Sequence, residues 1–193
     1  MNEILALFER TGAYLHGHFR LTSGLHSPEY MQCARVLQHP QHAEELGARL
    51  ARTLQELHPS TRIDVVVSPA IGGLIIGHEV ARALKARAIF TERGADGKMT
   101  LRRGFQVEPG ETAVVIEDVI TTGGSSREVY ELLRDAGVHV IAAGSIIDRS
   151  AGEANLGVPR AALASLRVTA YQESECPLCR DGVPIEKPGS RKS

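Results

Sequence analysis

The stretch Ala113–Ser126, which reads AVVIEDVITTGGSS, has the clearest structural pattern in this chain. It opens with four consecutive apolar residues, continues through Glu117 and Asp118, and then turns into Thr, Thr, Gly, Gly and Ser. A short apolar run followed by glycines predicts a buried strand that ends in a turn. The next residues, 124–137, have the spacing of an amphipathic helix and stop at Gly137. The stretch therefore predicts a strand, a turn and a helix, the repeating unit of a parallel sheet.

The same alternation extends to both sides of this stretch. Apolar, β-branched runs predict strands at residues 63–70, 87–92, 112–118 and 138–148, and helical spacing predicts helices at residues 43–57, 73–86 and 124–137. Because these strands are apolar throughout, both faces of the sheet are expected to be covered. The predicted fold class is α/β, with a central, mainly parallel sheet flanked by helices.

Length and composition suit one globular domain over residues 1–193. The formal net charge is -1, so no basic field suggests a nucleic-acid partner. No run approaches the ~20 apolar residues of a membrane helix, and the start MNEILALFERTG does not resemble a signal peptide. We expect a cytoplasmic protein without a membrane partner. Within the domain, segment 1–40 holds a short helix and irregular strands, residues 63–150 form the core, and residues 172–193 form an extended tail.

Three cysteines, Cys33, Cys176 and Cys179, are too few for a disulfide framework and fit a reducing compartment. The pair in ECPLCRDG has the spacing of half a zinc site, but a structural zinc ion needs four ligands. No second CxxC or HxxxH follows in the sequence. The pattern leaves two interpretations open: metal binding, and a turn whose two thiols happen to lie close.

The residues after the apolar run combine two chemistries. Ionised Glu117 and Asp118 accept hydrogen bonds and donate none, so they favour hydroxyl groups or a metal ion. Gly123 and Gly124 let backbone N–H groups approach an anion, and Ser125 lies where a helix N-terminus favours negative charge. A sugar phosphate satisfies both halves, with ribose hydroxyls on the acids and the 5′-phosphate in the turn. The alternative is that the two acids only cap a helix.

Four segments together resemble a known family. Ala113–Ser126 closely resembles the phosphoribosyl-diphosphate (PRPP) signature of the type I phosphoribosyltransferases. Three others resemble the orotate phosphoribosyltransferases within that family: FRLTSGLHSPEY (19–30), VVSPAIGGLIIG (66–77) and SIIDRS (145–150). The resemblance implies the type I phosphoribosyltransferase fold, with segment 1–40 as a small N-terminal hood and a mobile loop beside the PRPP-binding core.

The resemblance also implies which residues meet each part of the substrates. Two acids would hold the ribose diol and the next turn the 5′-phosphate: Glu117, Asp118, Thr121, Thr122, Gly123, Gly124 and Ser125. The loop facing the pyrophosphate, where the family often has a non-proline cis bond, would be Ala70, Ile71, Gly72 and Gly73. The residues near orotate would be Ser23, Gly24, Tyr30, Thr121 and Arg149. Of these, Arg149 would pair with the orotate carboxylate. The simpler interpretations are a surface charge for Arg149, a core aromatic for Tyr30 and a plain helix start for Gly73.

Residues 93–111 form a polar connection that predicts a lid or a disordered loop with a hairpin inside it. The chain departs here from the family pattern, because the usual Arg-Lys pair and His-Gly are missing, and Thr22 and Gly72 stand where many members have lysines. We expect Lys98 to be the catalytic cation, with Arg93 as the second choice. Further phosphate contacts would be Arg102 and Arg103. The alternative for all four is a solvated charged surface.

Together, these features imply a reaction. The enzyme would move ribose 5-phosphate from PRPP to orotate, giving orotidine 5′-monophosphate and pyrophosphate. Mg²⁺ would be the cofactor, held mainly by PRPP with no protein ligand assigned, and the loop would reach the site of the other subunit in a homodimer. Two alternatives remain: a phosphoribosyltransferase for a purine or uracil, and a PRPP-sensing regulator without catalysis. Arg149 discriminates against the first, because a base without a carboxylate does not require it.

Overall fold

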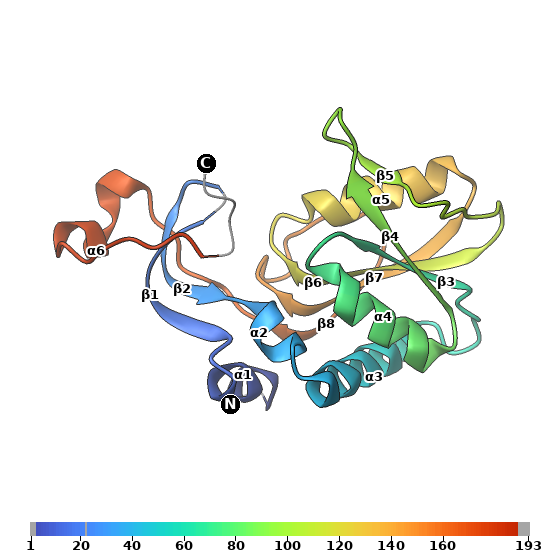
Figure 1. The fold of residues 1–193 in the computed structure, drawn as a ribbon, viewed down its shortest axis with the longest axis horizontal. Helices are drawn as coiled ribbons and strands as arrows, with labels where there is room; N and C mark the ends of the chain where they lie inside the picture. The colour runs from blue at the N-terminus through green and yellow to red at the C-terminus, as the bar shows by residue number, and fades with distance from the viewer. Residues whose placement is uncertain (1–2, 22, 189–193) are drawn as a thin grey trace. The chain divides into compact units, whose positions relative to one another are not determined.

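The chain divides into two compact units in the computed structural model, which describes residues 3–21 and 23–188. The larger unit spans Leu37–Leu166, and the smaller unit joins the segment up to Val36 with the segment from Arg167 onward (Figure 1). Thr22 and the last five residues of the predicted tail lie outside the described residues.

A six-stranded sheet organises the larger unit. Its spatial order is β5-β4-β3-β6-β7-β8, and every neighbouring pair is parallel except β4 with β5. The strands are β3 (Val65–Pro69), β4 (Arg87–Arg93), β5 (Met99–Leu101), β6 (Thr112–Ile120), β7 (His139–Asp148) and β8 (Arg160–Ser165). The predicted α/β class with a mainly parallel sheet is confirmed.

Helices cover both faces of this sheet, as predicted. Figure 1 shows α3 (Pro40–Leu57) and α4 (Gly73–Leu84) together on one side and α5 (Gly124–Asp135) on the other. All five residues of β3 are buried, because alternate side chains pack against opposite layers. Val65 and Val67 belong to the same core cluster as Val129 of α5.

The strand order reverses next to β3. The chain passes from β3 through α4 to β4 on one side, and β6 later joins the other side of β3. In open α/β sheets the crevice beyond the carboxyl ends of the strands at such a reversal is where ligands bind. The loop after β3 and the turn after β6 both follow the carboxyl ends of these neighbouring strands, where a ligand is expected.

The connection 93–111 contains the predicted hairpin. β5 pairs antiparallel with β4, and the Gly94 N–H donates to the Lys98 carbonyl at 2.8 Å to close the turn. Met99 is buried in the core, and Phe105 is partly buried against it. The connection is therefore a structural strand with an exposed tip at 95–98, rather than a lid along its whole length.

The smaller unit is built around one hairpin. Helix α1 (Glu3–Arg10) precedes β1 (Tyr14–Arg20) and β2 (His26–Met31), which pair antiparallel, and α2 (Cys33–Leu37) follows. The register shifts between His16 and Phe19, which is the irregularity expected for these strands. The predicted short helix followed by irregular strands is confirmed.

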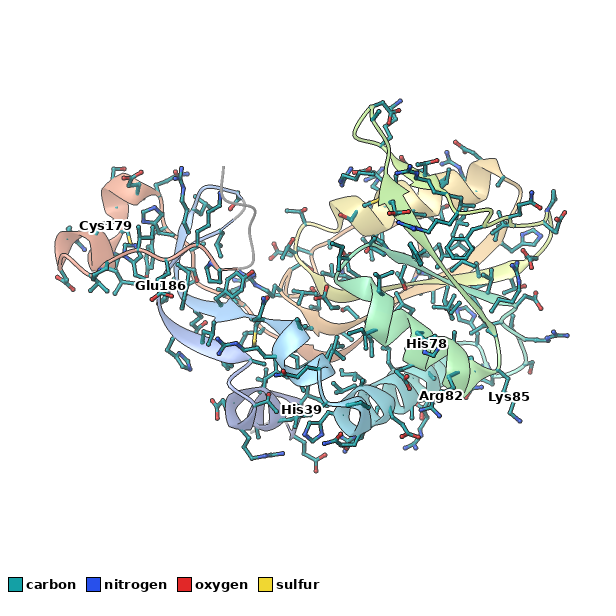
Figure 2. The ribbon with its side chains drawn as sticks, viewed as in Figure 1. His39, His78, Arg82, Lys85, Cys179 and Glu186 are labelled. Carbon is teal, nitrogen blue, oxygen red and sulfur yellow. The ribbon has the colours of Figure 1, made fainter. Side chains whose placement is uncertain are left out.

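The tail is not an extended arm, contrary to the prediction. Tyr171 bridges to His26 on β2, and Glu186 bridges to Phe19 on β1, so the tail pairs with both outer edges of the hairpin. Between the two bridges it forms a 3-10 turn (Glu173–Glu175) and α6 (Pro177–Arg180), and Figure 2 labels Cys179 and Glu186 on this path. Unpaired backbone groups at strand edges favour such pairing.

The helices can also be compared with the length and apolar character of membrane-spanning helices. Over the described ranges, none combines the length and apolar character that crossing a bilayer requires.

Candidate active site

A pocket of about 240 Å³ lies at the carboxyl end of β6. It is lined by Arg93, Glu117, Val119, Thr121, Thr122, Gly123, Gly124, Ser125 and Glu128. The structure thus brings together one predicted acid, the predicted phosphate turn and one predicted cation. The pocket is polar and open to solvent, which suits a ligand such as a sugar phosphate.

The turn between β6 and α5 has the geometry of an anion site. Gly123 precedes the helix with φ of 80°, a conformation that favours glycine, and an added Cβ would collide with the Leu156 side chain. The first turn of α5 contains no acidic residue. Because the first N–H groups of a helix have no intrahelical partner, they are available to a phosphate here.

Glu117 is the titratable group of this pocket. Burial raises its pKa to about 7, the neighbouring Asp118 adds to the increase, and a hydrogen bond donated by the Ser126 hydroxyl to Oε2 opposes it. Ser126 was not among the predicted site residues, although its position in the first turn of the predicted helix could have indicated a place near the site. Near neutral pH the free protein therefore holds this carboxyl partly protonated.

Asp118 faces the loop after β3 rather than the pocket wall. Successive strand side chains alternate, and an added Cβ on Gly72 would lie 2.5 Å from Asp118 Oδ1. Any side chain at position 72, including the lysine common in the family, would require the Asp118 carboxylate to move. Burial raises the pKa of Asp118 as well. Loop and acid are thus in contact, as a shared ligand site requires.

The loop itself has the predicted backbone. The peptide bond Ala70–Ile71 is cis, Ile71 is 82% exposed, and α4 begins at Gly73. An added Cβ on Gly73 would lie 2.8 Å from the Ile116 carbonyl oxygen, so this glycine both starts the helix and permits close approach to β6.

The predicted cations are placed differently from one another. Arg93 donates to both carboxylate oxygens of Glu128 on α5, at 2.9 and 3.1 Å, and to the Gly97 carbonyl. Lys98 is exposed at the hairpin tip. Glu128 was not predicted, and its position one turn after Gly124 was the available signal.

The remaining two arginines lie further along the same connection. Arg103 pairs with both oxygens of Glu92, at 2.8 and 2.9 Å, and its guanidinium lies over the Phe90 ring. Arg102 is exposed. Among the described residues, neither arginine lines the pocket, nor does Lys98, so their phosphate and catalytic roles stay predictions.

Thr121 and Arg149 emerge side by side. The register pairs Ile120 of β6 with Asp148 of β7, and the Arg149 N–H donates to the Ile120 carbonyl at 2.8 Å. The residues that follow each strand therefore leave the sheet at the same edge. This places Arg149 next to the phosphate turn, where the base of a nucleotide product would be expected.

The other residues predicted to meet orotate belong to the smaller unit. Ser23 and Gly24 are exposed in the turn between β1 and β2, where Gly24 has φ of 85°. Tyr30 is partly buried on β2, with its ring 5.8 Å from that of Phe19. Tyr30 therefore also packs as an aromatic residue, and the contacts of all three with a base stay predictions.

Comparison with known proteins agrees with this geometry. Residues 34–158 match the model of the phosphoribosyl transferase domain. The chain is 53% identical to the orotate phosphoribosyltransferase of Pelotomaculum thermopropionicum over 195 residues, covering 99% of this chain and 98% of the relative.

Solved structures point the same way. The crystal structure of orotate phosphoribosyltransferase from Aeropyrum pernix superposes with a TM-score of 0.70 at 27% identity, covering 85% of this chain and 94% of that one. Adenine phosphoribosyltransferase from Saccharomyces cerevisiae has a TM-score of 0.65 at 17% identity, covering 82% of this chain and 99% of that one, and this likeness reflects the fold alone. The larger unit has the type I phosphoribosyltransferase fold. The chain belongs to the phosphoribosyltransferase family and, within it, to the orotate phosphoribosyltransferases.

Proposed function

We propose that this protein transfers ribose 5-phosphate from PRPP to orotate, giving orotidine 5′-monophosphate and pyrophosphate, a step of pyrimidine biosynthesis. The observation that carries the proposal is the pocket that joins Glu117 to the uncapped N-terminus of α5, with Arg149 leaving the neighbouring strand. Its support from relatives is the 53% identity to an orotate phosphoribosyltransferase over almost the whole chain.

In this proposal, different site residues bind the phosphate and the ribose of PRPP. The turn from Thr121 to Ser125 binds the 5′-phosphate through backbone N–H groups. In their ionised forms, Glu117 on the pocket wall and Asp118 beside the loop after β3 would accept hydrogen bonds from the ribose hydroxyls. As the bond at the anomeric carbon breaks, positive charge develops on the ribose and negative charge on the departing pyrophosphate. The two acids face the first charge, and the cations of the hairpin complement the second.

Mg²⁺ fits the donors of this site. Glu117 and Asp118 supply carboxylate oxygens, the ligands that this hard cation prefers. Burial raises the pKa of both carboxyls because it disfavours their negative charges, and a bound cation would offset those charges. Held mainly by the diphosphate and diol of PRPP, the ion would supply neutralisation of the charge on the leaving group.

The test is a comparison of acceptor bases. We would follow the ultraviolet absorbance of orotate with PRPP and Mg²⁺, and assay uracil, adenine and hypoxanthine in parallel. Turnover of orotate alone supports the proposal. Turnover of a purine or uracil instead would leave the fold and the PRPP site but refute orotate as the acceptor, and tight PRPP binding without turnover would indicate the regulator.

Arg149 provides the second arm of this test. Replacing Arg149 by Ala should raise KM for orotate by about 10²-fold, because a charge-assisted pair to the carboxylate is lost, with KM for PRPP little changed. Arg62→Ala, which removes an exposed arginine near β3, is the matched control. Equal effects on both substrates would show that Arg149 does not select the base.

The oligomeric state and the cellular location belong to the same proposal. We infer a homodimer in which the β4–β5 hairpin tip, with exposed Lys98, completes the site of the partner. We also infer a cytoplasmic location, supported by the three cysteines Cys33, Cys176 and Cys179, none of which forms a disulfide.

A further inference from the structure

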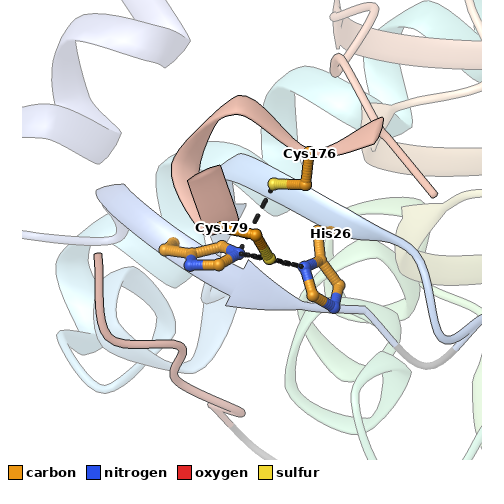
Figure 3. A group of neighbouring side chains, drawn as sticks. His26, Cys176 and Cys179 are labelled. Carbon is orange, nitrogen blue, oxygen red and sulfur yellow. Dashed lines mark hydrogen bonds between the residues drawn. The ribbon is translucent and has the colours of Figure 1, made fainter. Parts of the chain in front are cut away.

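Four side chains in the smaller unit converge on one point. His18, His26, Cys176 and Cys179 each offer one ligand atom, and all four atoms lie within 4.8 Å of one another. Figure 3 shows His26, Cys176 and Cys179 directed toward a common centre. The cluster lies wholly in the smaller unit, whereas the pocket beside Glu117 lies in the larger one, so it is a second site.

The distances match those of a tetrahedral metal site. His18 Nε2 lies 3.0 Å from His26 Nδ1, 3.5 Å from Cys176 Sγ and 3.6 Å from Cys179 Sγ, and His26 Nδ1 lies 3.2 Å from Cys179 Sγ. Zinc bonds of about 2.0–2.1 Å to nitrogen and about 2.3 Å to sulfur put tetrahedral ligand atoms roughly 3.3–3.8 Å apart. A zinc ion at the centre therefore needs only small side-chain adjustments.

Hydrogen bonding alone does not account for this arrangement. The second ring nitrogen of His18, Nδ1, lies 2.8 Å from the Val183 carbonyl, and a carbonyl can only accept, so Nδ1 carries the hydrogen. His18 Nε2 then has a lone pair and no hydrogen, and it lies close to three atoms, His26 Nδ1, Cys176 Sγ and Cys179 Sγ, of which it can accept a well-aligned hydrogen bond from only one. A metal-binding histidine typically has this second contact, which fixes both the tautomer and the ring orientation.

Charge balance fits the burial of the cluster. His18 and His26 are each 3% exposed, and Cys176 is fully buried. Two thiolates and two neutral imidazoles around Zn²⁺ have no net charge, so the group can be buried at low electrostatic cost. The number and type of ligands are those of a closed structural zinc site.

The fold explains how distant residues form this set. On the hairpin, His26 pairs with Arg20, and the ring of His18, two residues earlier on β1, lies beside the His26 ring with centroids 4.9 Å apart. Cys176 and Cys179 are three residues apart around the start of α6, which puts both sulfurs on one side. The tail brings its cysteines to the histidines by pairing with both edges of the hairpin.

We propose that His18, His26, Cys176 and Cys179 bind a structural Zn²⁺ ion that fastens the tail to the β1–β2 hairpin. The site is distinct from the proposed Mg²⁺ of the reaction in position and ligand type. Its occupancy is measurable without any assay of catalysis.

The first experiment measures the metal content of the purified full chain. Mass spectrometry of metals should find one zinc per chain after growth in zinc-containing medium. After removal of zinc, added Co²⁺ should give the strong visible absorption of tetrahedral cobalt, together with a thiolate-to-cobalt charge-transfer band. Less than a tenth of an equivalent of zinc with no cobalt spectrum, a Cys176–Cys179 disulfide, or stoichiometric binding of another metal in place of zinc would overturn the assignment.

Matched variants locate the site. His18→Ala and Cys179→Ser should lose at least ten-fold in bound zinc, whereas His16→Ala, an exposed histidine on the same strand, and Cys33→Ser, a buried cysteine outside the cluster, should keep it. If His18→Ala fails to fold, the cobalt spectrum of the unaltered chain still tests thiolate ligation. Full zinc occupancy in both cluster variants would refute this site.

The role in fastening the tail has its own measurement. Limited proteolysis of the zinc-loaded chain should leave the tail intact, and the chelated chain should be cut between Arg167 and Lys187 at least ten times faster. Equal cleavage rates with and without zinc would show that the ion does not fasten the tail.

Discussion

At the scale of the residue, Glu117 couples the protonation of the free protein to its stability. Burial raises its pKa from 4.5 to about 7, so the folded protein binds this proton more tightly than the unfolded chain does. The free energy of unfolding therefore has a contribution from Glu117 that is greatest below pH 4.5 and falls as pH rises toward 7.

This predicts a pH-dependent difference between the natural chain and Glu117→Gln. Between pH 5.5 and pH 8 the natural chain should lose on the order of 1–2 kcal/mol of unfolding free energy relative to the variant, as measured by urea denaturation without ligands. Glu56→Gln, which removes an exposed carboxylate on α3, should follow the natural chain. Parallel pH profiles for the natural chain and Glu117→Gln would contradict the raised pKa.

The same scale explains why two site residues escaped prediction. Ser126 and Glu128 lie in the helix that the motif opens, but which side chains face the pocket depends on the rotation of α5 over the sheet. The sequence predicted the strand and turn that bring Glu117 and the glycines to one pocket, because a strand followed by glycines has few alternative geometries. Side-chain partners such as the Arg93–Glu128 pair required the packed structure.

At the scale of the element, the β4–β5 hairpin combines a strand that packs into the core with an exposed tip. Truncation from Gly94 to Leu101 would remove buried Met99 and the whole of β5, so loss of turnover could reflect a damaged core. The exposed tip can be tested by single substitution instead.

Lys98→Ala should lower kcat by about 10²-fold, because a cation facing the leaving group is lost, with a stability change within about 0.5 kcal/mol. Lys187→Ala, which removes an exposed lysine from the tail, is the control for loss of one charge. Near-normal kcat in Lys98→Ala combined with a large loss in Arg93→Ala would transfer the role to Arg93. Steady-state kinetics with saturating PRPP and orotate distinguish these outcomes.

Element prediction succeeded where local signals were strong and failed where partners decided. The strands β3, β4, β6 and β7 have continuous apolar runs and were expected near their observed positions. Strand β8 was not expected, because its sequence RAALAS is rich in alanine and its pairing with β7 overrides the local preference. The tail looked extended for the same reason: its partners lie far away in the sequence.

At the scale of the whole molecule, the proposed homodimer with shared sites predicts that two defective chains complement each other. In Lys98→Ala the acids are intact, and in Asp118→Ala the hairpin tip is intact. If the tip acts in the partner's site, a mixed dimer contains one complete site and one doubly defective site.

Equal mixing of the two variants after reversible dissociation should then restore about one-quarter of the natural activity, because half of the dimers are mixed and each has one working site. Neither variant alone should exceed about one-hundredth. The control is a mixture of Lys98→Ala with itself under the same treatment. Mixed dimers that stay inactive would place the tip in the site of its own subunit.

The cluster of two histidines and two cysteines could not be predicted as a unit from the sequence. The CxxC pair was visible, but its other ligands precede it by more than a hundred residues and are separated from one another by a hairpin turn. No fixed sequence spacing encodes them, since the spacing is set by strand pairing and by the return of the tail.

The return of the tail also sets an order of events on the ribosome. His18 and Cys176 are 158 residues apart, and the whole of the larger unit lies between them in the sequence. At translation rates of about 5–20 residues per second, the hairpin waits roughly 8 to 30 seconds for its partner segment. The larger unit can fold in that interval, so the smaller unit is completed last. A chain released before Arg167 would combine a folded core with a hairpin whose two edges remain open to other strands.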